Sequence, residues 1–280
     1  IVVSYVDTIK TVYDVLYSVY GNQGWWPIIN NKTLLCEYHT GAPKNEAERF
    51  EICVGAILTQ GNSWYPGVVR ALQQLKLGRP FNKQELDVIR KTEILNGKMS
   101  GKRQKVTPDL KQNKTIEVKK ITAMRLEKLA QIIRPSGYYN QKAKKLKIFA
   151  KYILDNYKGD LQRLFSKNNG ELRTELLSIY GVGCETADTI ILYSAAKPVF
   201  VIDAYTKRIF SRIGISKDSS SYADLQQFFM DNLPYEAELF NQYHALIVKL
   251  GKDICRKTPL CERCPVRRHC SYYKNKYKTA

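Results

Sequence analysis

Apolar residues recur at helical spacing through most of this chain of 280 residues, and this pattern restricts the fold more than any other feature. Such runs predict helices because positions three and four apart share one helix face. They cover residues 1–20, 48–58, 65–77, 121–133, 141–157, 171–179, 186–196, 204–213, 222–233 and 235–250. Glycine and proline separate these runs. A strand-like run, 199–202, is too short to build a sheet. The sequence therefore predicts an all-α fold.

The charge balance points to a polyanionic partner. Lys and Arg number 45 against 26 Asp and Glu, which gives a formal charge of +19. An excess of this kind favours nucleic acid, through neutralisation of phosphates and release of counterions. The alternative is a lysine-rich composition that only keeps the protein soluble. We expect no membrane partner, because no stretch approaches about 18 uncharged apolar residues, and no signal peptide is evident. The expectation is an intracellular monomer, in the cytoplasm or nucleoid, or in the nucleus of a eukaryote.

Basic residues also gather locally. Residues 97–120 carry eight Lys or Arg against Asp109 and Glu117, within an insertion that we place at about 79–120. The segment is either a supplementary contact to the DNA backbone or a solvated insertion. Four further lysines at 142, 144, 145 and 147 predict a solvated helix face.

Four of the seven cysteines lie close together near the end of the chain: Cys255, Cys261, Cys264 and Cys270. Such clustering in a chain without a signal peptide favours metal binding over disulfides. Four thiolates suit a [4Fe–4S] cluster or a tetrahedral structural zinc ion. Zinc sites usually combine two short C-x2-C knuckles, whereas here one knuckle is flanked by an outer cysteine on each side. The spacing favours the [4Fe–4S] cluster and leaves zinc as the alternative.

A second pattern joins a tight turn to a carboxylate. Residues 176–188 predict a helix, a hairpin at Tyr180, Gly181, Val182 and Gly183, and a second helix whose free N–H groups can bind phosphate. About twenty residues later, Asp203 precedes the helix predicted at 204–213. Asp203 is either an N-cap, a catalytic carboxylate, or both.

Together the L-x-x-x-G-V-G-x-x-T-A-D hairpin, the V-I-D helix start and the four-cysteine loop resemble the endonuclease III branch of the helix-hairpin-helix DNA glycosylases. The resemblance covers roughly residues 48–78 and 121–272. It implies two helical lobes flanking a DNA-binding cleft: a helical barrel with the hairpin at 49–199, and a cluster lobe formed by 1–48 and 200–280. It also implies that Asp203 is catalytic and that the hairpin binds the DNA backbone, together with Lys207 and Arg208.

The departures from this family concern strand cutting. Members that cut the strand carry a lysine shortly after the hairpin glycines, where this chain has Cys184 and Glu185. Glutamate cannot form an imine, so the resemblance supports base excision without lyase chemistry. Glu185 either acts in the pocket or complements the dipole of its helix. The Asp is followed by Ala204 and Tyr205, unlike the usual Thr-His or Gly-Asn, and the first cysteine interval is one residue short.

Aromatic residues suggest the substrate. Trp25, Trp26 and Pro27, with Gln60 and Trp64, resemble pocket segments of helix-hairpin-helix 3-methyladenine DNA glycosylases. Aromatic faces attract a cationic alkylated purine, and Gln60 is expected to fill or probe the gap left in the duplex. The tryptophans can equally be packing residues.

We therefore predict a monofunctional glycosylase acting on double-stranded DNA with a damaged base. The alternatives are a bifunctional glycosylase/AP lyase for oxidised pyrimidines and a non-catalytic damage-binding module. His244, on the helix that leads to Cys255, is predicted to be structural.

Overall fold

The computed structural model describes residues 5–98, 115–217 and 219–277. In this part of the chain the only strands are the two-residue segments β1 (Ile28–Ile29) and β2 (Cys36–Glu37), which pair antiparallel. The predicted all-α fold is confirmed. No helix within the described ranges combines the length and the apolar character needed to cross a membrane.

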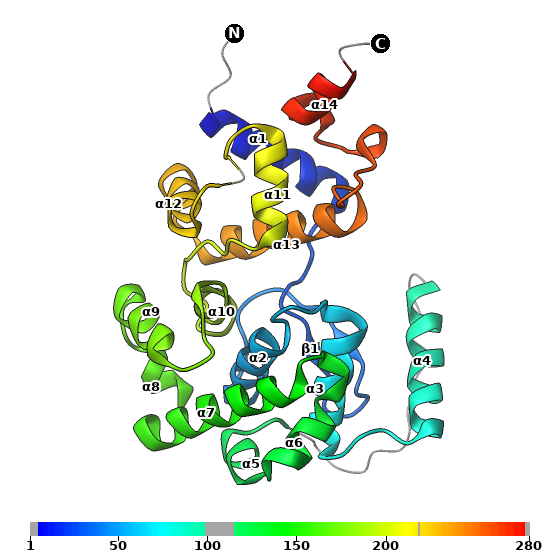
Figure 1. Ribbon diagram of the computed structural model, residues 1–280, viewed down its shortest axis with the longest axis vertical. Helices are drawn as coiled ribbons and strands as arrows, with labels where there is room; N and C mark the ends of the chain where they lie inside the picture. Colours follow the sequence, from blue (N-terminus) through cyan, green and yellow to red (C-terminus); the bar gives the residue numbers. More distant parts are fainter. Residues whose placement is uncertain (1–4, 99–114, 218, 278–280) are drawn as a thin grey trace. The chain divides into compact units, whose positions relative to one another are not determined.

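The chain forms two compact units (Figure 1). Unit 1 combines Ile1–Trp25 with Ile191–Ala280, and unit 2 is Trp26–Ile190. The boundaries expected from the sequence, at 48/49 and 199/200, therefore differ from those of the structure, at 25/26 and 190/191. Unit 2 keeps residues 26–48, which the sequence had grouped with the cluster lobe.

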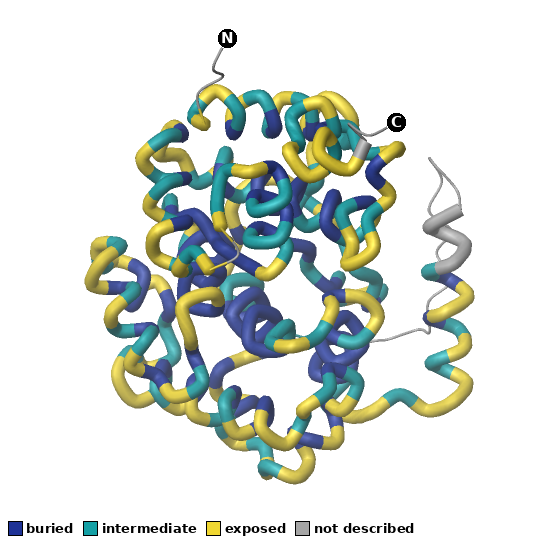
Figure 2. The backbone as a smooth tube through the Cα atoms, turned by 45° about the horizontal axis from the view of Figure 1, so that its top comes forward, coloured by how far each residue is buried: buried dark blue, intermediate teal, exposed yellow. Residues whose placement is uncertain are grey.

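Unit 2 is built around one buried helix. Its helices are α2 (Glu46–Leu58), α3 (Val69–Leu77), α4 (Lys83–Lys98), α5 (Val118–Ala123), α6 (Leu126–Ile132), α7 (Tyr139–Tyr157), α8 (Leu161–Phe165), α9 (Asn169–Ser178) and α10 (Cys184–Thr189), with a π turn at Trp64–Val68 and a 3-10 turn at Arg134–Ser136. Asn45 starts α2 because its side chain accepts a hydrogen bond from the Glu48 backbone N–H at 3.0 Å. From Phe50 to Leu58 every residue of α2 is buried (Figure 2), against α3, α7, α8 and α10.

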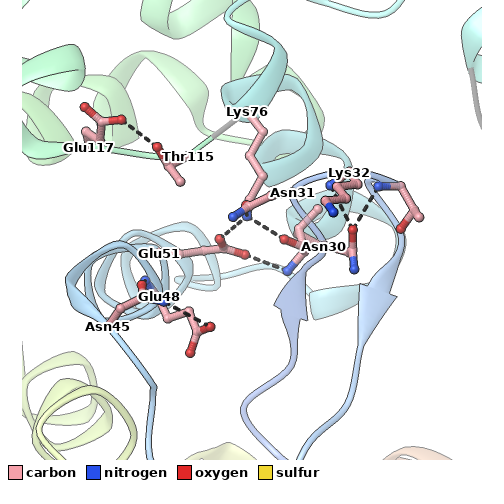
Figure 3. A network of polar contacts seen from close by, with 11 residues as sticks. Asn30, Asn31, Lys32, Asn45, Glu48, Glu51, Lys76, Thr115 and Glu117 are labelled. Carbon is pink, nitrogen blue, oxygen red and sulfur yellow. Dashed lines mark hydrogen bonds and ion pairs between the residues drawn. The ribbon is translucent and has the colours of Figure 1, made fainter. Parts of the chain in front are cut away.

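A buried ion pair explains why β1 belongs to unit 2. Lys76 Nζ and Glu51 Oε2 lie 2.5 Å apart, and both side chains are 2% exposed. Lys76 also donates to the Ile29 carbonyl at 2.5 Å and to Asn31 at 2.6 Å. Glu51 accepts from the Ile29 N–H at 2.7 Å. Figure 3 shows Lys76 and Glu51 pointing toward one another in this network. A buried pair is tolerated only when each partner is satisfied, so these contacts attach β1 firmly to α2 and α3.

Unit 1 holds an aromatic core. Its helices are α1 (Tyr5–Tyr20), α11 (Ala204–Ile213), α12 (Tyr222–Asn232), α13 (Ala237–Asp253) and α14 (Ser271–Tyr277), with 3-10 turns at Cys261–Arg263 and Arg267–His269 and a π turn at Ile190–Ser194 that spans the boundary of the units. α13 packs against α1 and α11. Phe200 stacks on Phe229 at 4.2 Å, beside Tyr243. The strand-like run 199–202 is buried but unpaired as a strand, and Gln226 donates to the Phe200 carbonyl at 2.7 Å.

Two predictions about basic segments need correction. The first part of the expected insertion forms a helix, α4, while residues 99–114 lie outside the described residues. The lysines near the start of α7 do not form one solvated face. Lys142 is 2% exposed and donates to the Leu58 and Ser136 carbonyls at 2.7 and 2.6 Å. Lys147 donates to the last carbonyls of α5, at Thr122 and Met124. Both lysine amines therefore donate hydrogen bonds to backbone carbonyls at the ends of neighbouring elements.

Candidate active site

In unit 1 the structure confirms one of the two roles expected for Asp203, the helix N-cap. It is the N-cap of α11, and its Oδ1 accepts from the Thr206 backbone N–H at 2.7 Å and from the Thr206 hydroxyl at 2.8 Å. The side chain is buried. Burial alone would raise its pKa, but His244 and the Thr206 hydrogen bonds outweigh burial and hold the pKa of this carboxyl below its usual value. Asp203 is therefore a buried carboxylate that stays ionised.

Two residues that the sequence did not connect with Asp203, His244 and Tyr193, lie beside it in the structure. His244 Nε2 lies 3.6 Å from Asp203 Oδ2, an ion-pair distance longer than a hydrogen bond. The other ring nitrogen, Nδ1, is 2.6 Å from the Tyr193 hydroxyl. A lone histidine in an apolar helix gives no sequence signal for partners 41 and 51 positions away, which is why it was interpreted as structural only.

The two hairpin glycines of unit 2 differ in whether the fold itself requires glycine. Gly181 has φ +87°, and a Cβ there would meet Lys145 Cγ at 2.4 Å. Gly183 is the N-cap of α10 with ordinary extended backbone, and a Cβ there would meet nothing within 4 Å. Nothing inside the described unit requires glycine at 183. The open N–H groups at this helix start suit an anion approaching from outside.

A cavity of about 520 Å³ lies beside the hairpin within unit 2. It is lined by residues of α2, the loop after it, α7 and α10: Ala56, Thr59, Gln60, Gly61, Lys145, Gly181, Val182, Gly183, Cys184, Glu185, Thr186 and Thr189. Gln60 Nε2 donates to the Gly181 carbonyl at 2.8 Å and to the Thr186 hydroxyl at 2.9 Å. Lys145 donates to Gln60 Oε1 at 2.6 Å. Gln60, expected to probe the duplex, is thus held against the hairpin.

Glu185 lies in the first turn of α10, is exposed, and lines this cavity. Tyr180, at the hairpin, is also exposed, at 67%, while Val182 is buried. Of the cavity-lining residues, Lys145 carries the amine, and that amine is engaged by Gln60. The position after the hairpin therefore presents a carboxylate and no amine.

The predicted pocket aromatics are divided between the units. In unit 2, Trp26 and Trp64 are 6% and 3% exposed and pack edge to face, with ring centres 5.1 Å apart. Trp26 also lies against Gly55 of α2. Pro27 is buried beside it. In unit 1, Trp25 is half-buried, and the Lys252 ammonium lies 5.8 Å from its ring centre. Trp26 and Trp64 thus do not present two parallel faces to one another.

Of the two basic residues predicted to contact DNA, Arg208 has partners within unit 1. It donates to the Cys255 and Gly251 carbonyls at 2.9 and 3.2 Å, and it lies over the Tyr205 ring. Lys207 is half-buried in the same helix, α11. Arg208 therefore attaches the start of the four-cysteine loop to α11.

The four cysteines line one small cavity in unit 1, with Arg212 at its edge. Burial and the three neighbouring thiols raise the pKa of Cys264 to about 11. Among the residues that the structure describes, no three His, Cys, Asp or Glu side chains are arranged to hold a metal ion. The chemistry of the donor set fits a metal centre, because four thiols in one apolar cavity ionise readily only when a cation compensates the charge.

Comparisons with known proteins decide the family. Residues 93–235 match the HhH-GPD superfamily of base excision DNA repair proteins, a segment that includes the hairpin and Asp203. The protein MJ1434 of Methanocaldococcus jannaschii, provisionally assigned as a DNA repair glycosylase, is 38% identical over 266 residues, which is 94% of this chain and 96% of its own length. The chain belongs to the HhH-GPD superfamily. It is a base excision repair DNA glycosylase, and the endonuclease III-like resemblance drawn from the sequence is confirmed.

Solved structures of HhH-GPD proteins share its fold. The H. pylori 3-methyladenine DNA glycosylase MagIII, bound to 1,N6-ethenoadenine, is 25% identical with a TM-score of 0.58, over 88% of this chain and 97% of that chain. A non-covalent endonuclease III–DNA complex gives a TM-score of 0.63 at 18% identity, over 99% of this chain and 100% of that chain. The second likeness concerns the fold alone.

Proposed function

We propose that this HhH-GPD protein is a monofunctional glycosylase that hydrolyses the N-glycosidic bond of an alkylated purine in double-stranded DNA. The observation that carries the proposal is Asp203, a buried carboxylate kept ionised at the start of α11. The target nucleotide must leave the base stack to be cut. An anion placed against its sugar stabilises the oxocarbenium-like transition state.

An alkylated purine suits this arrangement chemically. Alkylation makes the base cationic, so it leaves without being protonated, and one carboxylate suffices on the sugar side. The half-buried Trp25 already has the Lys252 ammonium 5.8 Å from its ring centre, the kind of contact that an aromatic ring makes with a cation. The likeness to a 3-methyladenine glycosylase crystallised with an ethenoadenine supports the same substrate class.

The absence of lyase activity is inferred from the residues beside the hairpin. Schiff-base chemistry needs a nucleophilic amine, and Glu185 stands where strand-cutting relatives carry lysine. Lys145 also lines the hairpin cavity, but its amine donates to Gln60. The second candidate function, a glycosylase with lyase activity, would have to use Lys145 or another lysine.

The four cysteines Cys255, Cys261, Cys264 and Cys270 are proposed to hold a [4Fe–4S] cluster. Its contribution when bound would be structural, fixing the loop. Arg212 donates to Cys255 Sγ at 3.3 Å, and the Cys270 thiol donates to the Arg212 carbonyl at 3.3 Å. The loop and the hairpin would then supply fixed donors for DNA phosphates.

The test is a gel assay on an end-labelled duplex with one 3-methyladenine-type lesion, developed with and without hot alkali. Strand cleavage is expected only after alkali, and it should disappear in Asp203→Asn. Asparagine caps helices as well as aspartate does, so this variant separates catalysis from folding. Cleavage without alkali, with borohydride trapping that is lost in Lys145→Ala, would establish the lyase instead. Base release that persists in Asp203→Asn would refute the proposed role of Asp203.

A further inference from the structure

Three buried polar side chains from three segments of unit 1 lie next to one another. Tyr193 comes from the π turn Ile190–Ser194, His244 from the middle of α13, and Asp203 from the start of α11. Their exposed fractions are 3%, 6% and 9%. Polar groups buried to this extent are retained when they serve one another.

The contact with Tyr193 bears on where the histidine proton lies, because a hydroxyl can either donate to Nδ1 or accept from it. The Tyr193 hydroxyl is 2.6 Å from Nδ1, and burial raises the pKa of Tyr193 well above its usual value, so the hydroxyl stays protonated. A hydroxyl that donates to Nδ1 leaves the ring proton on Nε2, the nitrogen 3.6 Å from Asp203 Oδ2. The doubly protonated ring also carries a proton there. Only the Nδ1–H tautomer would turn a lone pair toward the carboxylate.

We propose that His244, oriented by Tyr193, is a positioning residue that holds the Asp203 carboxylate in place for base excision. The inference rests on the proposed function, because it acts through Asp203. Thr206 holds Oδ1 by two hydrogen bonds, and His244 Nε2 lies 3.6 Å from Oδ2, within ion-pair reach but beyond hydrogen-bond distance. A carboxylate with a fixed Oδ1 and a histidine beside Oδ2 needs less reorganisation as charge develops on the sugar.

Other titratable groups near Asp203 are Tyr205, next to it in the chain, and Lys252 of α13. The charge of Asp203 raises the pKa of Tyr205, in addition to burial. Burial lowers the pKa of Lys252, and Asp203 opposes that shift. His244 is the first of the neighbours that lower the pKa of Asp203, ahead of Thr206, so its removal should change the titration of Asp203 most.

The first experiment measures single-turnover base release against pH, for the wild type, His244→Asn and Tyr193→Phe. In His244→Asn, the acid limb of the pH–rate profile should move to higher pH by about one unit. At a pH below the limb, this shift lowers the rate of base release about tenfold, and the loss becomes smaller as the pH rises. Tyr193→Phe should give a smaller shift in the same direction. Tyr243→Phe is the matched control: it removes a buried hydroxyl of α13 that donates to the Ile9 carbonyl at 2.7 Å. It should leave the limb in place.

A second readout does not depend on activity. The chain has 3 histidines, so His244 is assigned in long-range ¹H–¹⁵N spectra by the signal missing from His244→Asn. Nε2 should be protonated in the wild type, and the Nδ1–H tautomer should appear in Tyr193→Phe. A bare Nε2 in the wild type, or an unmoved acid limb in His244→Asn, overturns the inference. If Asp203→Asn still releases the base, the proposed function fails instead, whatever His244 does.

Discussion

A methyl side chain would clash at Gly181 but not at Gly183. Alanine substitutions at these two positions can therefore separate an effect on folding from an effect on DNA binding. Gly181→Ala should destabilise the protein by about 1–2 kcal/mol, because φ is +87° and the new Cβ would meet Lys145. Gly183→Ala should leave the free energy of unfolding nearly unchanged, since its Cβ has open space. It should weaken duplex binding about tenfold, through loss of one close phosphate contact. Urea unfolding and a DNA titration on both variants check this. Unchanged binding by Gly183→Ala would contradict the hairpin's role.

Lys142 should make stability depend on pH. Burial, with Lys145 nearby, lowers its pKa from 10.5 to about 8. Between these values the unfolded chain binds more protons than the folded one, so stability rises with pH. The difference in unfolding free energy between the wild type and Lys142→Met should therefore grow from pH 8 to pH 10.5. Lys144→Met, which removes an exposed lysine of α7, is the matched control. A constant difference for Lys142→Met would exclude the shifted amine.

The site residues that could be predicted from the sequence are those marked by their immediate neighbours in the chain. Asp203 stood out because it precedes a helix, and the cysteines because of their spacing. His244 could not be found in this way, since its partners Tyr193 and Asp203 come from other segments. Lys142 was predicted to be solvated for the same reason: its carbonyl partners belong to the ends of other elements.

At the scale of elements, the last turn of α11 and the four-cysteine loop are joined by Arg212. Besides its two sulfur contacts, it donates to the Arg256 and Lys257 carbonyls at 2.6 and 2.9 Å. If the loop holds the proposed [4Fe–4S] cluster, Arg212→Met should lose it about tenfold faster under a chelator, a scale typical of changes to residues that contact metal ligands. Iron content and visible absorption report the loss. Arg263→Met, an exposed arginine in the same loop, is the control. Equal retention by both variants would show that α11 does not hold the loop.

Helices were predictable where apolar spacing was long, as in α7 and α13. The sequence missed α4, which lies in a stretch interpreted as a basic insertion, because its polar composition hides its periodicity. It also missed β1 and β2, since two-residue strands have no pattern. These short strands are held by the Lys76–Glu51 pair, a contact between distant positions that no local signal predicts.

At the scale of the whole molecule, helical content predicts the fold class but not where the units divide. The division at 25/26 instead of 48/49 follows from burial of Trp26 and Ile29 against α2 and α3. The spacing of apolar residues indicates that such positions are buried, but it does not show in which of the two hydrophobic cores they pack. The family match does not place the division either, because residues 93–235 include parts of both units.

The charge of +19 left two interpretations open, and salt dependence separates them. If the excess serves DNA binding, the logarithm of the affinity should fall linearly with the logarithm of salt, by about 0.9 per phosphate neutralised. Six to ten such contacts would cost about 10³–10⁵-fold between 50 and 200 mM. Damaged and undamaged duplexes should share this slope, because phosphates carry no lesion. Asp203→Asn should keep the slope while abolishing base release. A nearly flat dependence would mean that the charge serves solubility, and that affinity comes from the flipped base.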